Sequence, residues 1–349
     1  IPMELRAVNG NTLWELVQLR VKPEQEAFVA SNTESILEAY AAEKDGGTAL
    51  PFGLYEQGEP VGFCMLGYDT LDEDDPAIAK GNYCLWRFMV DETRQGQGLG
   101  KRALAMILFH IDTLPRGPAS CCWVSYVPEN AAAKRLYAAF GFTESEETCD
   151  GETVALRPIL PRVCLQDGEL TLRSAGEEDV PLLHKWWNDG AVMAHAGFPN
   201  GLGQTMEQTR EDVAWAALKR RLFLIEYAAT PIGEMGYSLR DGAAKIGIKI
   251  CESTFQNRGL GPRCLKLLCD YLFYTHAPQA EKITLNTNLN NRRAQHVYEK
   301  FGFARQGVCR SVFQDQLGVL QDAVEYTLAK DAYGRRQGQR VTEADADKL

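Results

Sequence analysis

The stretch "RQGQGLGKRAL", residues 94–104, places glycines at every second position immediately before an Ala- and Leu-rich segment. Glycine lets the backbone turn sharply and come close to a ligand. The first turn of the helix that follows offers unpaired N–H groups at the positive end of the helix dipole. The stretch therefore predicts an anion-binding turn that suits a phosphate or pyrophosphate group.

A second stretch, "QNRGLGPRCLK" at residues 256–266, repeats the same turn. One offset of 161 positions relates the two turns and several residues that follow them. The matched positions are Gln95 and Gln256, Gly98 and Gly259, Gly100 and Gly261, Asn130 and Asn291, Tyr137 and Tyr298, and the pairs Gly141-Phe142 and Gly302-Phe303. The chain of 349 residues therefore predicts two tandem copies of one domain.

The two copies share a coarse pattern of strands and helices. In the first copy we expect strands at 4–8, 52–68, 82–90 and 119–127, and helices at 35–44, 100–111 and 130–140. In the second copy we expect strands at 170–175, 222–239, 244–250 and 282–288, and helices at 178–189, 261–273 and 292–301. We expect an N-terminal domain at 1–160, a linker at 161–169, a C-terminal domain at 170–333 and a polar tail at 334–349, in the α/β (α+β) class.

Composition excludes several classes of protein. The formal charge is −10, and residues 1–160 hold 13 basic and 24 acidic residues, so a nucleic-acid binder is not expected. No apolar run is long enough for a membrane span, and residues 1–10 lack the pattern of a signal peptide. Ten cysteines without a C-x-x-C motif favour buried, reduced thiols in a cytoplasm and no metal site. The acidic first half suits a cationic substrate such as an amine.

Two familiar phosphate-binding motifs do not fit the glycine turn. A Walker A loop needs G-x-x-x-x-G-K-[ST], but Gln95 and Arg102 occupy its first and last positions, and Pro262 replaces its Lys in the second copy. A dinucleotide-binding fold needs an acidic residue at the end of the next strand, whereas Asp112 falls at the end of the helix. The combination of the turn with Asn and Tyr at fixed spacing, found twice, is far more specific than the glycines alone.

This combination, Q-x-x-G-x-G followed about thirty residues later by N-x-x-A-x-x-x-Y-x-x-x-G-F, resembles the GNAT superfamily of acyl-CoA-dependent N-acetyltransferases. The resemblance covers nearly the whole chain, once in each half. The first half is similar to bacterial spermine/spermidine (diamine) N-acetyltransferases, and the second to the ribosomal-protein-alanine N-acetyltransferase branch. It implies two tandem domains, each with a mixed, mostly antiparallel sheet flanked by helices.

The resemblance also implies which residues bind acetyl-CoA, the acyl donor. The splayed strand that pairs with the pantetheine arm holds Phe88, Met89 and Val90 in the first copy, and Ile250 and Cys251 in the second. The pyrophosphate cradle consists of Gln95, Gly96, Gln97, Gly98, Leu99, Gly100 and Lys101, and of Gln256, Asn257, Arg258, Gly259, Leu260 and Gly261. Asn130 and Asn291 contact the cofactor arm, while Arg102 and Arg263 add positive charge near the turns.

The chemistry that the resemblance implies is direct transfer of the acetyl group to an amine. A backbone N–H of the splayed strand stabilises the oxyanion, and Tyr137 or Tyr298 gives a proton to the leaving thiolate. The proton of the amine passes to a carboxylate or through ordered water; the carboxylate candidates are Glu252 and Glu234 in the second copy and the acidic run 69–75 in the first. We interpret Trp186-Trp187 as core residues.

The leading hypothesis is an N-acetyltransferase that uses acetyl-CoA. A polyamine-like small amine suits the first copy, and a peptide N-terminus or small amine the second, with arylamines and aminoglycosides left open. One alternative is that one copy is catalytic and the other is structural or senses acyl-CoA. Another is an interaction protein that kept the fold. No nucleic-acid or membrane partner is expected, and the oligomeric state stays open, with a homodimer among the options.

Overall fold

The computed structural model describes residues 3–70, 72, 74–160, 162–219, 221–276 and 279–336. The described residues fall into two compact units. The first holds those before residue 162 together with 210–218, and the second holds the others. The expected C-terminal domain at 170–333 includes residues 210–218, which group with the first unit. The part of the expected tail after residue 336 lies outside the described residues.

The first unit is built on a seven-stranded sheet with the strand order β1-β2-β3-β4-β5-β7-β6. Its strands are β1 (Met3–Ala7), β2 (Ala49–Glu56), β3 (Glu59–Tyr68), β4 (Tyr83–Val90), β5 (Cys121–Tyr126), β6 (Thr143–Cys149) and β7 (Glu152–Pro158). β4 and β5 pair in parallel, and the other neighbours pair antiparallel. The sheet is therefore mixed and mostly antiparallel, as expected.

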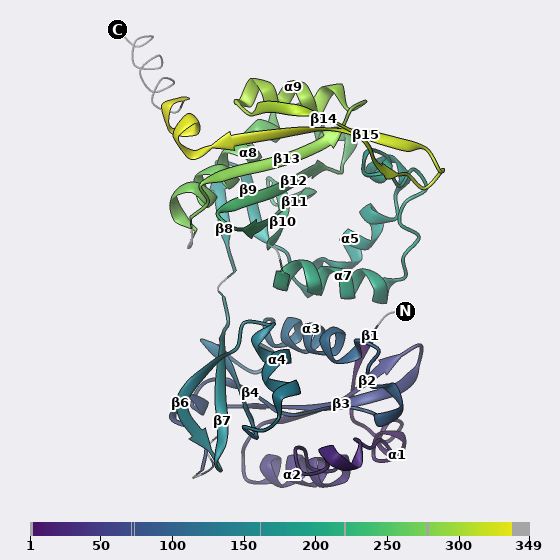
Figure 1. Ribbon diagram of the computed structural model, residues 1–349, viewed down its shortest axis with the longest axis vertical. Helices are drawn as coiled ribbons and strands as arrows, with labels where there is room; N and C mark the ends of the chain where they lie inside the picture. Colours follow the sequence, from purple (N-terminus) through teal and green to yellow (C-terminus); the bar gives the residue numbers. More distant parts are fainter. Residues whose placement is uncertain are drawn as a thin grey trace. The chain divides into compact units, whose positions relative to one another are not determined.

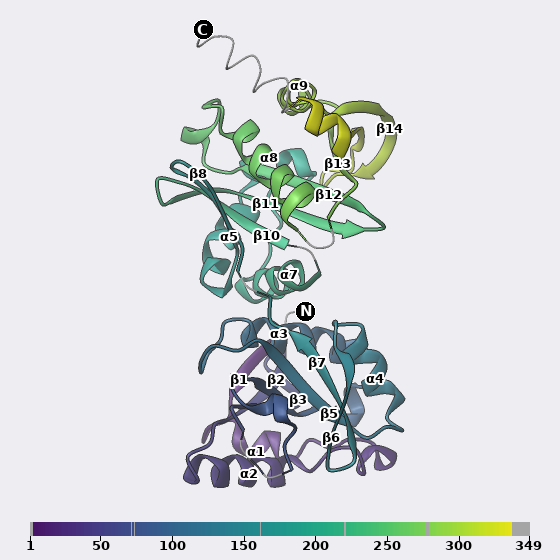
Figure 2. The same cartoon turned by 90° about the vertical axis from the view of Figure 1, so that its left-hand side faces the viewer.

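Helices cover both faces of this sheet (Figure 1). They are α1 (Leu13–Leu16), α2 (Asn32–Lys44), α3 (Leu99–Ile111) and α4 (Ala131–Ala138). Figure 1 and Figure 2 show α3 and α4 on one face and α1 and α2 on the other. α3 is buried from Ala103 to Phe109, because its run of alanines and large apolar side chains packs into the core rather than against solvent.

The second unit repeats this plan in an eight-stranded sheet with the order β14-β15-β13-β12-β11-β10-β9-β8. Its strands are β8 (Cys164–Asp167), β9 (Leu170–Ser174), β10 (Arg221–Tyr227), β11 (Thr230–Arg240), β12 (Ala243–Ile250), β13 (Lys282–Asn288), β14 (Ala304–Gln314) and β15 (Leu320–Ala329). β12 and β13 form its parallel pair. β8 has no counterpart in the first sheet, and it occupies residues that the sequence analysis assigned to the linker.

The helices that follow along the chain are α5 (Val180–Trp187), α6 (Gly190–Met193), α7 (Met206–Lys219), α8 (Leu260–Asp270) and α9 (Arg292–Phe301). Residues 210–218 of α7 belong to the first unit, and the other four helices belong to the second. α8 and α9 lie on the face of the sheet opposite to α5 (Figures 1 and 2). The core against α8 includes Phe223, Tyr237 and Leu265. This burial follows from the apolar positions that recur along α8 with helical period.

The repeat holds at the level of strand register. Tyr83 of β4 lies opposite Cys122 of β5, and Ala244 of β12 lies opposite Ile283 of β13. Each residue of the second pair is 161 positions after its counterpart in the first. The two parallel pairs are thus equivalent structures, and any site built on one has a counterpart on the other.

The cysteines are free thiols, and seven of the ten are buried. Burial raises the pKa of Cys122 and of Cys264 to about 12, which keeps these thiols protonated. In the described part of the chain, no group of His, Cys, Asp or Glu is arranged to hold a metal ion. The helices described here include none that is long and apolar enough to cross a membrane.

Candidate functional site

In each unit the parallel strand pair opens into a gap. Within the described residues, β4 pairs with β5 only at Tyr83 and Cys84, and β12 pairs with β13 only from Ala243 to Lys245. Beyond these points β4 stays paired with β3 up to Val90, and β13 stays paired with β15 up to Asn288. Each strand is thus held by its outer neighbour while the inner edges separate. The free backbone groups along these edges can pair with an extended ligand.

The glycine turn follows directly after the open end of each gap. Gly98 and Gly259 precede the first residues of α3 and α8 and adopt left-handed backbone, with φ of 78° and 72°. Gly96 has φ of 79°, and its counterpart Asn257 adopts the same region at 61°. Asn tolerates this conformation better than most residues, so the second turn keeps its shape without that glycine. A Cβ at Gly96, Gly98 or Gly259 would meet nothing within 4 Å, so these positions are open to a ligand.

Exposure within the turns shows which parts anchor them. Gln97 and Gly98 are exposed, as are Arg258 and Gly259, whereas Leu99 and Leu260 are buried. The buried leucine fixes the helix to the core, and the exposed backbone before it presents the N–H groups of the first helical turn. Lys101 is also exposed. This is the arrangement that an anion at a helix N-terminus requires.

The two matched glutamines tie each turn to the end of its strand. Gln95 Nε2 donates to the carbonyl of Val90 at 3.0 Å, and Gln256 Nε2 donates to the carbonyl of Ile250 at 2.9 Å. These side chains therefore shape the cradle. Arg102 and Arg263, which we expected to add positive charge near the turns, are both held in ion pairs. Arg102 pairs with Glu56 at 2.6 Å, and Arg263 pairs with Asp167 at 2.8 Å.

The two matched asparagines are helix N-caps. Asn130 Oδ1 accepts from the N–H of Ala133 at 3.0 Å, and Asn291 Oδ1 accepts from the N–H of Ala294 at 3.1 Å. This capping explains the Asn at the start of α4 and α9 without any ligand. Asn291 nevertheless also lines a cavity, so its role in binding remains a prediction alongside its structural one.

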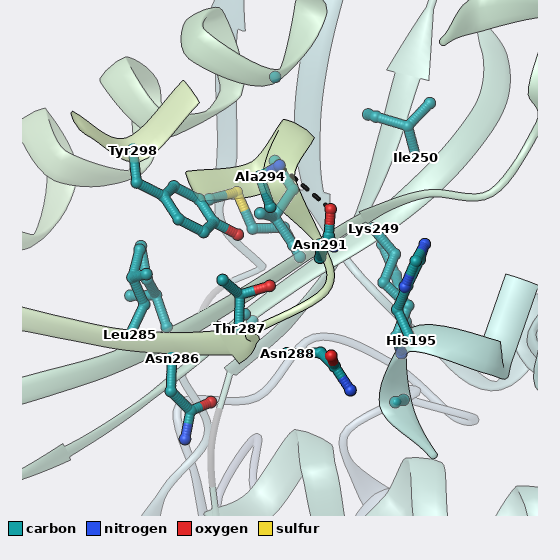
Figure 3. A pocket seen from close by; sticks show the side chains of 18 of the residues that line it. His195, Lys249, Ile250, Leu285, Asn286, Thr287, Asn288, Asn291, Ala294 and Tyr298 are labelled. Carbon is teal, nitrogen blue, oxygen red and sulfur yellow. Dashed lines mark hydrogen bonds and ion pairs between the residues drawn. The ribbon is translucent and has the colours of Figure 1, made fainter. Parts of the chain in front are cut away.

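The two matched tyrosines are buried side chains of α4 and α9. Tyr137 packs against Tyr126 and Phe142, and Tyr298 packs against Phe303 and Tyr326. Burial raises the pKa of Tyr298 to about 12, and that of Tyr137 well above its usual range. Both phenols are therefore protonated at neutral pH, the state that a proton donor must have. Figure 3 shows the Tyr298 hydroxyl directed toward the cavity.

The cavity of the second unit has a volume of about 840 Å³. Its lining combines the cofactor side with a second, polar side. From the predicted cofactor residues it includes Ile250, Gln256, Gly261, Asn291 and Tyr298. Asn286, Asn288, His195 and Lys249 lie below the tyrosine in Figure 3. The gap between β12 and β13 thus opens into a cavity whose volume is in the range of ligand-binding pockets.

The two carboxylates that the sequence offered as bases occupy different surroundings. Glu234 is buried in the cavity lining, accepts from Trp187 Nε1 at 3.0 Å and is ion paired with Lys249. Glu252 accepts from Trp186 Nε1 at 2.7 Å and lies outside the cavity lining. Both tryptophans are buried, which confirms their interpretation as core residues. They also fix the orientation of the two carboxylates.

The remaining predicted residues lie at the edges of the two gaps. Phe88, Met89 and Val90 form the end of β4, and Cys251 follows the end of β12 and is buried. β4 also has a β-bulge at Trp86, opposite Met65 and Leu66, whereas β12 pairs with β11 without interruption. The acidic run 69–75 follows β3, and Asp69 Oδ1 accepts from the N–H of Gly81 at 2.6 Å. The described part of this run therefore begins beside the closed end of the gap.

Sequence reasoning missed several residues of the cavity. Lys245 and Ser238 come from neighbouring strands, His195 from the segment after α6, and Phe313 from β14. Their types carry no motif, and only the folded sheet brings the β11–β12 hairpin, β14 and the segment after α6 together around the cavity. The one local signal lies in β12, where Lys245, Gly247 and Lys249 alternate with isoleucines. This alternation places both lysines on the same face of the strand.

In comparisons with known proteins, each half of the chain matches acetyltransferases. Residues 13–142 match the acetyltransferase (GNAT) family, and residues 169–304 match the acetyltransferase (GNAT) domain. The first half is 31% identical over 159 residues to the spermine/spermidine N(1)-acetyltransferase of Bacillus subtilis (strain 168), covering 45% of this chain and 99% of that protein. It is 30% identical, with the same coverage, to a probable spermine N(1)-acetyltransferase of Bacillus subtilis subsp. natto (strain BEST195).

Solved structures that resemble single units of the chain include two acetyltransferases. One is RimL, a ribosomal L7/L12 alpha-N-protein acetyltransferase in complex with coenzyme A, with a TM-score of 0.44, 21% identity, and coverage of 49% of this chain and 99% of that one. The other is a spermidine N-acetyltransferase from Vibrio cholerae in complex with CoA and spermine, with a TM-score of 0.43, 23% identity, and coverage of 48% and 99%.

Proposed function

The chain belongs to the GNAT family of N-acetyltransferases, whose cosubstrate is acetyl-CoA, and from this premise we propose that each unit binds one acetyl-CoA and transfers its acetyl group to a primary amine. The observation that carries the proposal is the repeated gap in the sheet. In both units the gap ends at a turn whose central glycine is left-handed and has open space at its Cβ position. An extended arm fits the gap, and a pyrophosphate fits the turn.

When bound, acetyl-CoA supplies the thioester. The amine attacks its carbonyl carbon, so that a C–N bond forms and the C–S bond breaks. Backbone N–H groups on the free edge of β4 or β12 stabilise the charge that develops on the carbonyl oxygen. Tyr137 or Tyr298 donates the phenolic proton to the leaving sulfur, which is the role that a buried, protonated phenol can fill.

The amine must lose a proton, and in the second unit a carboxylate is the acceptor that we propose. Glu234 fits better than Glu252, because Glu234 lines the cavity and Glu252 does not. Glu252→Gln therefore serves as the comparison variant. Glu234→Gln should lower kcat more than Glu252→Gln, and neither substitution should change the affinity for acetyl-CoA. For the first unit the acidic run 69–75 stays the candidate region, and its base is left unassigned.

The proposed acceptors differ between the two units. For the first unit we propose a polyamine, because its relatives are named for spermine and spermidine and because residues 1–160 carry a net charge of −11. A negative field draws polycations toward the protein. Residues 161–349 carry +1, so the second unit lacks this attraction. For it we propose a different amine.

Calorimetric titration of acetyl-CoA tests the proposal. Gly100→Glu and Gly261→Glu place bulk and negative charge in one cradle each, and the structure has room for both side chains. A Cβ at Gly261 meets nothing within 4 Å, and a Cβ at Gly100 meets only Leu136 Cδ2 at 3.9 Å. Gly100→Ala and Gly261→Ala are the matched controls, since they add a methyl group without charge.

We expect two acetyl-CoA sites per wild-type chain, one site in each Glu variant and two in each Ala control. Release of CoA with spermidine should then survive Gly261→Glu and be lost with Gly100→Glu. A single site in the wild type would favour the alternative in which one unit is structural or senses acyl-CoA. Absence of acetyl-CoA binding from the wild type would refute the proposal.

A further inference from the structure

Side chains alternate between the two faces of the sheet along β12, and this alternation shows which face the acceptor would meet. Ile246, Ile248 and Ile250 pack toward the core that contains α8. Successive side chains of a strand point to opposite faces, so Lys245, Gly247 and Lys249 point away from α8. All of these β12 residues line the cavity. The acceptor therefore meets the second set, on the face that α5 partly covers (Figure 2).

On this face, the register of β11 and β12 gives three successive pairs of opposite residues, which we call steps. Glu234 lies opposite Lys249, Gly236 opposite Gly247, and Ser238 opposite Lys245. At the first step the two charges neutralise each other through an ion pair. The middle step has no side chains, and a Cβ at Gly247 would meet nothing within 4 Å. Gly247 thus leaves floor space in the cavity that no packing constraint explains.

The third step, formed by Ser238 and Lys245, holds a positive charge that has no ion-pair partner in the described part of the chain. Lys245, Ser238 and, two residues beyond the β13 partner of Lys245, Asn286 are all exposed in the cavity lining. Within the described part of the chain, no protein group forms a hydrogen bond or ion pair with any of these three side chains. An ammonium, a hydroxyl and an amide N–H are the donors that a carboxylate accepts.

The step also lies at the closed end of the gap. The parallel pairing of β12 and β13 ends at Lys245, so Lys245 marks the closed end of the gap. A ligand arm that enters at the turn after Ile250 runs toward this end. Of the other Lys and Arg residues in the lining, Lys249 is ion paired with Glu234, and Arg293 donates to Gln256 Oε1 at 3.0 Å on the side of the turn.

The first unit lacks this group of donors. The residue 161 positions before Lys245 is Cys84, which is buried, and the β3 partner of Cys84 is Gly67. The unbalanced cation is thus a property of the second copy and not of the shared cofactor cradle. It follows that the two units differ where an acceptor would lie, while their turns stay alike.

Resting on the proposed function, we infer that the acceptor of the second unit is a primary amine that also carries a carboxylate, held by Lys245, Ser238 and Asn286. The amine lies over the Gly236–Gly247 floor beside Glu234. The same arrangement repels a polyamine, whose second ammonium would face Lys245. The second unit therefore acetylates amino acids or similar zwitterions rather than polycations.

The test uses the full chain with Gly100→Glu, so that turnover comes from the second unit. Release of CoA is measured with 3-aminopropanoate, 4-aminobutyrate and 5-aminopentanoate, each against its primary amide. We expect kcat/KM to be about tenfold higher for at least one acid than for its amide, and spermidine to be poorer than both. Lys245→Gln should remove the preference, while Lys282→Gln, a control on exposed β13 surface outside the cavity lining, should keep it.

Acetyl-CoA titration into the Lys245→Gln variant separates binding of the acceptor from folding of the unit, because the cofactor site should be unchanged. Equal use of acids and amides, or a preference that survives Lys245→Gln, would overturn the inference while leaving the proposed acetyl transfer intact. Binding of acetyl-CoA without turnover of any amine would overturn both. The chain length that gives the highest kcat/KM reports the distance between the amine and Lys245.

Discussion

At the scale of single residues, the matched tyrosines show how burial supports a chemical role. A tyrosine ordinarily ionises near pH 10, but burial raises the pKa of Tyr298 to about 12. An acid acts in its protonated form, so a raised pKa extends the working range toward high pH. The amine, in contrast, reacts only after it has lost its proton. Activity should therefore rise with pH and stay high.

We predict that Tyr298→Phe lowers kcat of the second unit by about 100-fold, because general acid catalysis contributes on that order. Affinity for acetyl-CoA should change less than twofold. In the wild type, kcat/KM should rise to a plateau with no decline up to about pH 10.5. Steady-state rates of CoA release between pH 6.5 and 10.5, in the Gly100→Glu background, measure both effects.

Tyr274→Phe is the control for this substitution, because Tyr274 is 48% exposed and lies outside the cavity lining. It should leave kcat and the pH profile unchanged. Full activity of Tyr298→Phe, or a decline of wild-type activity with an apparent pKa near 9, would show that the phenol is not the proton donor. The neighbouring Tyr326 is unsuitable as a control, since its hydroxyl donates to Glu299 at 2.9 Å.

Among whole elements, the β14–β15 hairpin forms part of the acceptor cavity. Phe313 of β14 lines the cavity together with His195 of the segment after α6. Gln316, in the hairpin turn, joins the two segments: its N–H donates to the carbonyl of Gly197 at 2.9 Å. Its side chain donates to the carbonyl of Gly201 at 3.0 Å and accepts from the N–H of Asn200 at 2.9 Å.

Gln316→Ala should raise KM for the acceptor of the second unit about fivefold and leave acetyl-CoA affinity unchanged. The variant loses two hydrogen bonds of about 1 kcal/mol each, so the walls that carry His195 and Phe313 become less fixed. Steady-state kinetics measure KM, and calorimetry measures acetyl-CoA binding. Gln314→Ala is the control, because Gln314 donates to the carbonyl of Gly318 within the hairpin. Equal effects of the two variants would argue against the role given to Gln316.

Helices and edge strands differ in how well the sequence alone predicts them. α3 and α8 follow from apolar periodicity and a left-handed glycine, and both were expected. The two C-terminal strands of each sheet, β6 and β7 and β14 and β15, were missed. In β6 ("TESEETC") and β14 ("ARQGVCRSVFQ") most side chains are exposed, and no hydrophobic alternation marks them. They exist because β7 and β15 supply partners for their backbone. Tertiary pairing, not local pattern, determines such edge strands.

The same distinction applies to the candidate site. The turns, their strands and the helices with Asn and Tyr were predicted because the repeat fixes them locally. Lys245, Ser238 and Asn286 were not, because only the register of β11, β12 and β13 brings them together. The residues shared by both copies are those we propose for the cofactor, and those that differ are the ones we propose for the acceptor. Internal repetition therefore predicts the common chemistry and conceals the specificity.

For the whole chain, both units share one source of pH sensitivity. Their cores hold thiols that burial keeps protonated, with the pKa of Cys122 in the first unit and of Cys264 in the second raised to about 12. In an unfolded chain a thiol ionises near pH 8.5. Between these values the unfolded chain binds fewer protons than the folded one, so stability decreases as pH rises.

We predict that the midpoint of thermal unfolding is nearly constant from pH 7 to 8 and falls steadily above pH 9. Each such thiol lowers the free energy of unfolding by about 1.4 kcal/mol per pH unit in that window. Replacing Cys122 and Cys264 together with Ala should make the fall shallower, whatever its effect at pH 7. Cys164→Ala, at an exposed thiol, should leave the slope unchanged. An identical slope in the wild type and in the double variant would mean that other groups, such as the buried tyrosines, control alkaline unfolding.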